Sequence, residues 1–180
     1  MRNKTTVYLV LSALLCALTA ILSQIQLPVP PIPASLSLLG VHLCGALLSP
    51  AWSACALAAY LFLGACGVPV FAGFLSGPSV LFGPTGGFLF GYVLCAPLES
   101  ALIRRLGFTR RSLLAAMAAG AALCYALGTA WFMLLSGTGL LQALSACVIP
   151  FVPGDVLKAV FASSIALRLH KPLSFLGLSA

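Results

Sequence analysis

Two ionisable side chains near the end of the chain are the strongest candidates for chemistry. Asp155 and Lys158 are three residues apart, so on a helix they lie on one face. They follow Pro153 and Gly154 at the expected start of a helix, where free backbone N–H groups and the helix dipole favour an anion. Together they offer an acceptor for ligand N–H groups and a cation for a ligand carboxylate.

The pattern of the other reactive residue types predicts neither an enzyme nor a metal or cofactor site. The seven cysteines show no C-x-x-C or His-paired spacing, and we expect them to be small packing residues. His42 is accompanied by no second His, Asp or Glu and is expected to hydrogen-bond a neighbour. The glycine-rich segment 83–87 lacks the lysine of a phosphate loop. Without that lysine the segment does not predict ATP hydrolysis by this chain. If the chain transports a solute uphill, the energy must come from another subunit or from an ion gradient.

The elements that must position the Asp155–Lys158 pair are membrane helices. Only 6% of the 180 residues are charged and 62% are hydrophobic, against roughly 25% and 45–50% in soluble domains. So few polar side chains cannot cover a water-facing surface. The composition therefore excludes a soluble enzyme, a disordered chain and a conventional nucleic-acid binder. We expect one all-α integral membrane domain over residues 1–180.

Six transmembrane helices are predicted from the apolar runs; the first is long enough to cross the bilayer, and the second is short. Their approximate ranges are 7–25, 35–48, 50–65, 85–104, 112–135 and 155–169. A signal peptide is the alternative for the first run, but no small-x-small cleavage site follows it. A half-helix at the membrane interface is expected between Gly139 and Pro150, since about ten residues are too few to span.

Two proline-rich segments interrupt these runs. Residues 26–34 hold four prolines and are expected to form an extended loop. Residues 67–84, with four glycines and three prolines, are apolar yet cannot be regular helix. Irregular backbone at membrane depth persists only where protein covers it or where it lines a cavity. We therefore expect residues 67–84, the lid loop, to fold back onto the protein.

The net charge of +7 indicates topology, not a nucleic-acid partner. Eight of the nine basic residues fall in three clusters, at positions 2–4, 104–111 and 168–171, which flank apolar runs. With six crossings and a cytoplasmic N-terminus, all three clusters lie on the cytoplasmic side of the cell membrane, as the positive-inside rule requires. In this scheme Asp155 and Lys158 are the only charges outside the cytoplasmic flank.

A ligand pocket is the sharper interpretation of the Asp155–Lys158 pair, because intramembrane ionisable residues are functional candidates by default. The plainer alternative is a helix cap with mutual neutralisation. For each further candidate, packing is as good an explanation as ligand contact. The candidates on the outer segments are Ser35, Ser37, Tyr60, Phe71, Ser79, Thr85, Tyr125 and Trp131. On the first helix, Ala13 and Ala17 form a small-xxx-small pair that permits close helix approach.

Four motifs, taken in order along the chain, resemble the BioY family. They are YLFLGACGVPVFA at 60–72, GPTGGFL at 83–89, YALGTAW at 125–131 and PFVPGDVLK at 150–158. The family comprises the biotin-binding S components of energy-coupling factor (ECF) transporters. The resemblance runs from the proline loop through the last helix.

The resemblance implies biotin capture on the outer side and partnership with a transmembrane coupling protein and two cytoplasmic ATPases. It implies that Asp155 and Lys158 contact biotin, that the lid loop occludes the site, and that Ala13 and Ala17 contact the coupling protein. Self-association is the expected arrangement if the chain works without those partners.

One departure concerns the segment after the proline loop, where family members carry threonine-leucine-glutamine and this chain has Ser35-Leu36-Ser37. A glutamine contact to the ligand would be missing or made by serine. Two uses of the charged pair stay open: Asp155 accepts the ureido N–H groups while Lys158 binds the carboxylate, or Lys158 neutralises Asp155 while backbone N–H groups bind the carboxylate. The alternative functions are an S component for another small vitamin and a structural membrane subunit without ligand.

Overall fold

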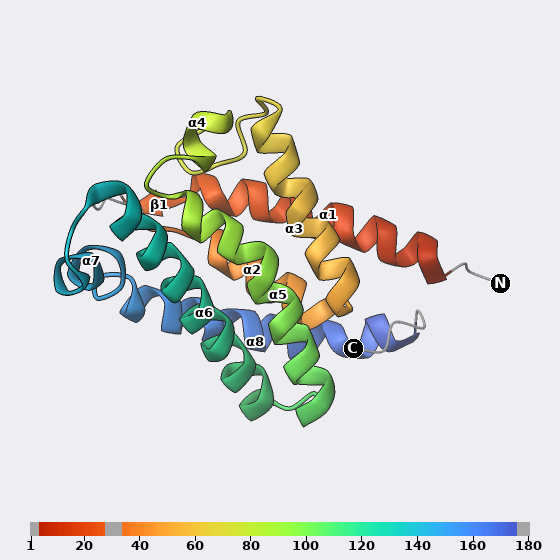
Figure 1. Ribbon diagram of the computed structural model, residues 1–180. Coiled ribbons are helices and arrows are strands. Elements are labelled where there is room, and N and C mark those ends of the chain that lie inside the picture. Colours follow the sequence, from red (N-terminus) through yellow and green to blue (C-terminus); the bar gives the residue numbers. More distant parts are fainter. Residues whose placement is uncertain (1–3, 28–33, 176–180) are drawn as a thin grey trace.

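The computed structural model describes residues 4–27 and 34–175, which form a helical bundle (Figure 1). The elements are α1 (Lys4–Gln24), β1 (Gln26–Leu27), β2 (Ala34–Ser35), α2 (Ser37–Leu47), α3 (Pro50–Ala65), α4 (Pro78–Leu81), α5 (Gly86–Leu106), α6 (Arg110–Ser136), α7 (Leu140–Cys147) and α8 (Val152–Phe175). Apart from the two short strands, every regular element in these two ranges is a helix. The all-α prediction is thereby confirmed.

Helix α8 begins earlier than the sequence predicts. We expect the break at 150–154 to precede a helix starting at Asp155, yet α8 starts at Val152 and holds Pro153 and Gly154 in its first turn. Proline is tolerated there because the first N–H groups of a helix have no intrahelical partner. Asp155 consequently lies within the first turn, where its backbone N–H donates to the Phe151 carbonyl oxygen at 2.9 Å.

The proline loop is closed at its base by a two-stranded antiparallel ladder. Gln26 pairs with Ser35, and Leu27 pairs with Ala34. This ladder brings Ser35 and the start of α2 beside the end of α1. The predicted extended conformation of residues 28–33 lies outside the described residues.

Three helices in the described ranges are long and apolar enough to cross a membrane: α1, α5 and α6. The pair α7 and α8, bent by 49°, would make a fourth span. Helices α2 and α3 are shorter, with 11 and 16 residues, and α2 covers only about 16 Å of a hydrocarbon core of about 30 Å. The six-span topology therefore stays a prediction. The eight-residue α7 occupies the predicted half-helix segment.

Helix α2 lies at the centre of the bundle, against α1, α5 and α8. Ten of its 11 residues are buried, which explains why so short a helix needs no lipid-facing side. Its apolar residues, among them Val41 and Cys44, form one core with Leu57 of α3 and with Leu113 and Met117 of α6. The helix therefore carries Ser37 and packs directly against α8, the element that carries Asp155.

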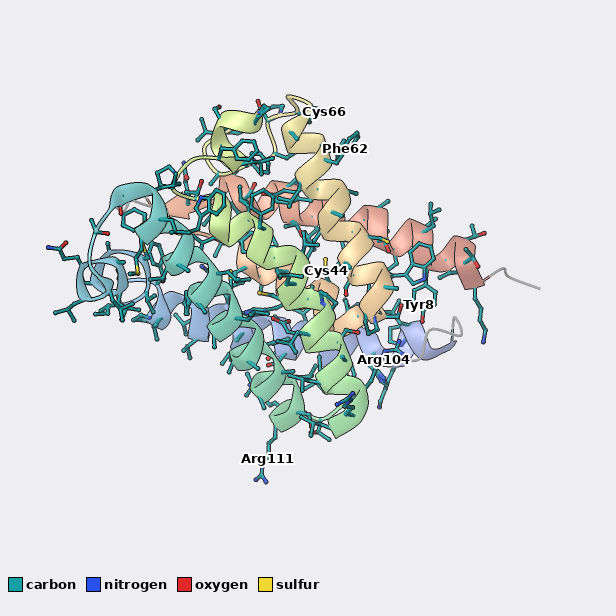
Figure 2. The ribbon with its side chains drawn as sticks, viewed as in Figure 1. Tyr8, Cys44, Phe62, Cys66, Arg104 and Arg111 are labelled. Carbon is teal, nitrogen blue, oxygen red and sulfur yellow. The ribbon has the colours of Figure 1, made fainter. Side chains whose placement is uncertain are left out.

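The segments that carry the basic clusters meet at one end of the molecule. Phe108, in the turn between α5 and α6, stacks on His170 near the end of α8 with ring centroids 3.9 Å apart. Figure 1 shows the start of α1 and the end of α8 away from β1 and α7. Figure 2 shows Arg104 and Arg111 at the opposite end from Cys66. This grouping agrees with the predicted common side; Arg2 lies outside the described residues.

Candidate functional site

A buried ion pair and a half-buried tyrosine form the centre of the site. The Lys158 ammonium donates to Asp155 Oδ1 at 2.5 Å, and the Tyr125 hydroxyl of α6 donates to Asp155 Oδ2. Asp155 is 8% exposed and Lys158 is 9% exposed. The pair is thus a desolvated ion pair that spans one turn of α8, and it contacts α6 through Tyr125.

A cavity of about 380 Å³ lies next to these three residues. That volume falls within the range of small-molecule sites. Its walls come from the ends of α1, α3 and α7, from the starts of α2, α5 and α8, from the middle of α6 and from the lid loop. Nine of the predicted site residues line it: Ser35, Ser37, Tyr60, Phe71, Ser79, Thr85, Tyr125, Asp155 and Lys158. The lining is mostly apolar, with hydroxyl groups around one ion pair, which suits a compact amphipathic ligand.

Trp131 is the predicted site residue that the structure does not place in the cavity wall. Its indole Nε1–H donates to the Gly83 carbonyl oxygen at 2.9 Å. The tryptophan is seated against the start of α5, because a Cβ on Gly87 would lie 2.3 Å from Trp131 Cβ. Trp131 therefore lies outside the cavity lining and holds the end of the lid loop against α6 through its bond to Gly83.

The lid loop is held over the cavity by hydrogen bonds to α1 and α3. Ser23 donates to the Val70 carbonyl oxygen at 2.5 Å, and Tyr60 donates to the same oxygen at 3.1 Å. Gln24 Oε1 accepts the Phe74 N–H at 2.8 Å. Because three side chains hold two loop positions, the loop covers one side of the cavity in a defined conformation.

Phe71 is the main apolar side chain that the lid loop places in the cavity wall. It is 1% exposed and packs edge-on against Tyr60, with ring centroids 5.6 Å apart. The ring lies directly over Gly64 of α3, where an added Cβ would be 2.1 Å from the Phe71 Cζ atom. A glycine at position 64 is therefore required for this contact.

Several lining residues are absent from the sequence prediction. Tyr92 is seven residues after Thr85 on α5, and two helical turns bring both to one face, a signal that the spacing contained. Phe151 belongs to the 150–158 motif itself. Ser23 and Cys147 join through tertiary packing alone, for which the sequence carries no local signal.

A chain of hydroxyl groups occupies the position where the family glutamine is expected. Ser35 Oγ lies 2.7 Å from Ser37 Oγ, which in turn lies 2.7 Å from the Tyr92 hydroxyl. All three residues line the cavity. These three hydroxyl groups thus supply polar atoms at the start of α2, where a glutamine would place a longer amide side chain.

His42 and Glu99 lie buried between helices, outside the cavity lining. His42 Nδ1 is 2.9 Å from Glu99 Oε1. The prediction that His42 hydrogen-bonds a neighbour is confirmed. Glu99, placed with the cytoplasmic flank only by elimination from the sequence, is 0% exposed within α5. No cluster of three or more metal-ligand types occurs among the described residues.

Ala13 and Ala17 lie on the exposed side of α1 and line a groove of about 610 Å³ between α1 and α3. The groove is almost entirely apolar and its α3 wall includes Cys55 and Ala59. Small residues on both walls allow a second helix to approach closely. The predicted small-xxx-small pair is therefore accessible at the surface.

Comparison with known proteins gives consistent relatives. The family model described as the BioY family matches residues 1–175. A protein named biotin transporter BioY from Thermotoga maritima is 37% identical over 91% of this chain and 95% of its own length. One named biotin transporter BioY2 from Lactococcus lactis is 33% identical over 97% of this chain and 96% of its own length.

A solved structure shares the fold. It is the crystal structure of the S-component for biotin from an ECF-type ABC transporter. The TM-score is 0.89, the identity is 27%, and the match covers 95% of this chain and 94% of that one. With several apolar helices and transporters as relatives, the chain is a multi-pass protein of the cell membrane. Family model, relatives and fold agree: this chain belongs to the BioY family.

Proposed function

We propose that this chain captures biotin for uptake, as the substrate-binding S subunit of an ECF-type transporter. The observation that carries the proposal is the cavity beside the buried Asp155–Lys158 pair, in a chain whose relatives are named biotin transporters. Biotin offers two ureido N–H donors, a carbonyl, an apolar bicycle and an anionic carboxylate. The cavity presents a complementary group for each of these features.

Donor and acceptor capacity supports one orientation of the ligand. The Lys158 ammonium has three N–H donors, and Asp155 Oδ1 takes one of them. Two donors are left for the biotin carboxylate. Each Asp155 oxygen accepts one bond from within the protein and keeps a lone pair for a ureido N–H. We therefore assign the carboxylate to Lys158 and the ureido group to Asp155.

The apolar rings of biotin fit the remaining lining. Phe71 and Leu75 of the lid loop, with Phe88 of α5 and Phe151 of the turn before α8, form apolar surface around the polar groups. Exclusion of water there strengthens the ligand's charge-assisted hydrogen bonds. The loop would have to move aside for entry, which makes it the gate of this proposal.

Affinity for biotin esters tests the assignment without altering the protein. A hydrogen bond to a charged group contributes about 1.5–3 kcal/mol, so biotin methyl ester should bind roughly 10- to 150-fold more weakly than biotin. Equal affinity would contradict the carboxylate role of Lys158. Tight binding of another vitamin without biotin binding would favour the first alternative function, and absence of any ligand would favour a structural subunit.

Variants provide the second arm of this test. Asp155→Asn should weaken biotin and its ester alike, because the ureido group is common to both. Arg111→Gln changes an exposed cation at the opposite end of the molecule and serves as the matched control. Its biotin affinity should equal that of the unaltered protein in titration calorimetry.

We further propose that the groove at Ala13 and Ala17 receives a helix of the transmembrane coupling protein, which joins two cytoplasmic ATPases. Ala13→Leu and Ala17→Leu would fill the groove and should abolish co-purification with coupling subunits while biotin affinity stays unchanged. Ala122→Leu on the exposed side of α6 is the control and should preserve co-purification. Persistent co-purification of the α1 variants would favour self-association or another contact surface.

A further inference from the structure

The buried His42–Glu99 pair is an acid–base pair in the bundle interior that the proposed function leaves unused. His42 belongs to α2 and Glu99 to α5, and the facing atoms are 2.9 Å apart. Both side chains are fully buried, at 1% and 0% exposure. Because ionisable groups are costly at membrane depth, such residues are functional candidates by default.

Two glycines shape the space around the Glu99 carboxyl group. A Cβ at Gly45 of α2 would lie 2.7 Å from Glu99 Oε2, and one at Gly120 of α6 would lie 2.1 Å from Glu99 Oε1. Three helices thus close around one carboxyl group. His42 Nε2 and Glu99 Oε2 have no hydrogen-bond partner among the described residues. The two glycines therefore leave just enough room for the Glu99 carboxyl group. Burial of the unpartnered His42 Nε2 and Glu99 Oε2 atoms is unfavourable.

Stability alone is a poor explanation for this arrangement. Well-packed apolar residues of similar volume are often as stabilising as a buried ion pair, or more so. Surrounding helices already supply a continuous apolar core next to the pair, with Cys44, Cys95 and Met117 all buried. A pair kept for packing would therefore be replaceable by aliphatic side chains. What the pair adds over aliphatic packing is a directional bond of fixed length between α2 and α5.

That bond lies on a polar seam that reaches the cavity. At the cavity end, Ser37 Oγ of α2 lies 2.7 Å from the Tyr92 hydroxyl of α5. Glu99 is seven residues after Tyr92, which places both on one face of α5 two turns apart. At the far end, the Ser100 hydroxyl donates to the carbonyl oxygen of Leu48 at 2.7 Å. The His42–Glu99 bond sits between these two contacts.

We propose that His42 and Glu99 are a positioning pair that keeps α2 in register with α5, so that Ser37 and Tyr92 hold the geometry of the cavity wall. The inference rests on the proposed biotin site, since its readout is biotin affinity. Neither residue of the pair lines the cavity, and the pair acts through the two hydroxyl residues. Sliding or rotation of α2 would separate the hydroxyl groups and misplace the wall nearest the proline loop.

Two substitutions at Glu99 separate geometry from charge. Glu99→Gln keeps the side-chain length and the Oε1 acceptor, so biotin affinity should stay within about threefold of the unaltered protein. Glu99→Asp keeps the carboxylate but is one methylene shorter, so it should lower the affinity about tenfold. Calorimetric titration with biotin in detergent, after thermal unfolding has shown each variant folded, measures both. Equal affinities, or the reverse order, would overturn the positioning role.

A double-mutant cycle tests the path to the cavity. Tyr92→Phe removes the hydroxyl partner of Ser37 and should weaken biotin binding in the unaltered background. In the Glu99→Asp background the same change should have little further effect, because the hydroxyl groups are already displaced. Additive losses would overturn the proposal, as would an Asp variant with unchanged affinity. Failure of the unaltered protein to bind biotin would instead refute the proposed function, and the inference with it.

Discussion

Replacing Gly64 with alanine tests whether the lid loop closes the cavity through Phe71. An alanine Cβ would lie 2.1, 2.5 and 2.6 Å from three atoms of the Phe71 ring, whereas ordinary contacts begin at about 3.4 Å. The ring must therefore move by about 1 Å or leave its place beside Tyr60. Overpacking of this kind costs about 1–3 kcal/mol.

The cost falls mainly on the closed loop, since the helices around Gly64 are held by other contacts. We expect biotin affinity to fall roughly 5- to 150-fold, with faster dissociation, because each 1.4 kcal/mol is a factor of ten. The unfolding temperature without ligand should change little. Equilibrium binding and dissociation of labelled biotin in nanodiscs, beside thermal unfolding without ligand, measure these effects.

Gly139→Ala is the matched control. A Cβ there meets nothing within 4 Å, and the φ of −70° suits alanine. This variant should bind biotin as the unaltered protein does. If Gly64→Ala also binds biotin with unchanged affinity and dissociation rate, then closure does not depend on the Phe71 contact, and the reasoning is refuted.

Three further substitutions have expected outcomes. Trp131→Phe keeps a ring but removes the donor to the Gly83 carbonyl oxygen, so biotin affinity should fall about fivefold, for a hydrogen bond of about 1 kcal/mol; unchanged titrations would exclude the supporting role. Lys158→Met leaves the Asp155 charge buried without its partner and should lower stability by about 3–5 kcal/mol in thermal unfolding. The double variant with Asp155→Asn should regain most of that stability but should not bind biotin. Ser100→Ala removes a buried hydrogen bond to the end of α2 and should lower stability by about 1–3 kcal/mol, with biotin affinity within threefold; a larger loss of affinity would show that the far end of the seam also shapes the cavity.

The ends of a helix could be predicted from the sequence where the residue types change sharply along the chain. Pro50 starts α3 at the predicted residue, and Ala65 ends it where the glycines and prolines begin. The start of α8 was not accessible, because proline and glycine usually mark a break but are tolerated in a first helical turn. Whether Pro153 and Gly154 lie before α8 or inside its first turn depends on how the preceding helix, α7, packs.

The candidate site followed from local composition to a large extent. Hydroxyl and aromatic residues on the outer segments, such as Ser37 and Tyr60, line the cavity, and their contact with a ligand stays a prediction. Trp131 shows the limit of this reasoning, since its position near the site was evident but its orientation was not. Orientation depends on which neighbour approaches closely, here the glycines at the start of α5.

The sequence by itself determined that this is a membrane bundle, where most of its helices run, and which ion pair belongs at the start of the last helix. These properties are local: they follow from apolar length, from proline and glycine, and from a spacing of three residues. Only the tertiary structure decided that His42 meets Glu99, that Tyr92 faces Ser37, and that α2 is central. In a chain whose lipid-facing and core-facing residues are both apolar, periodicity does not reveal which helix lies opposite which. Close packing of side chains against glycines then selects the partners.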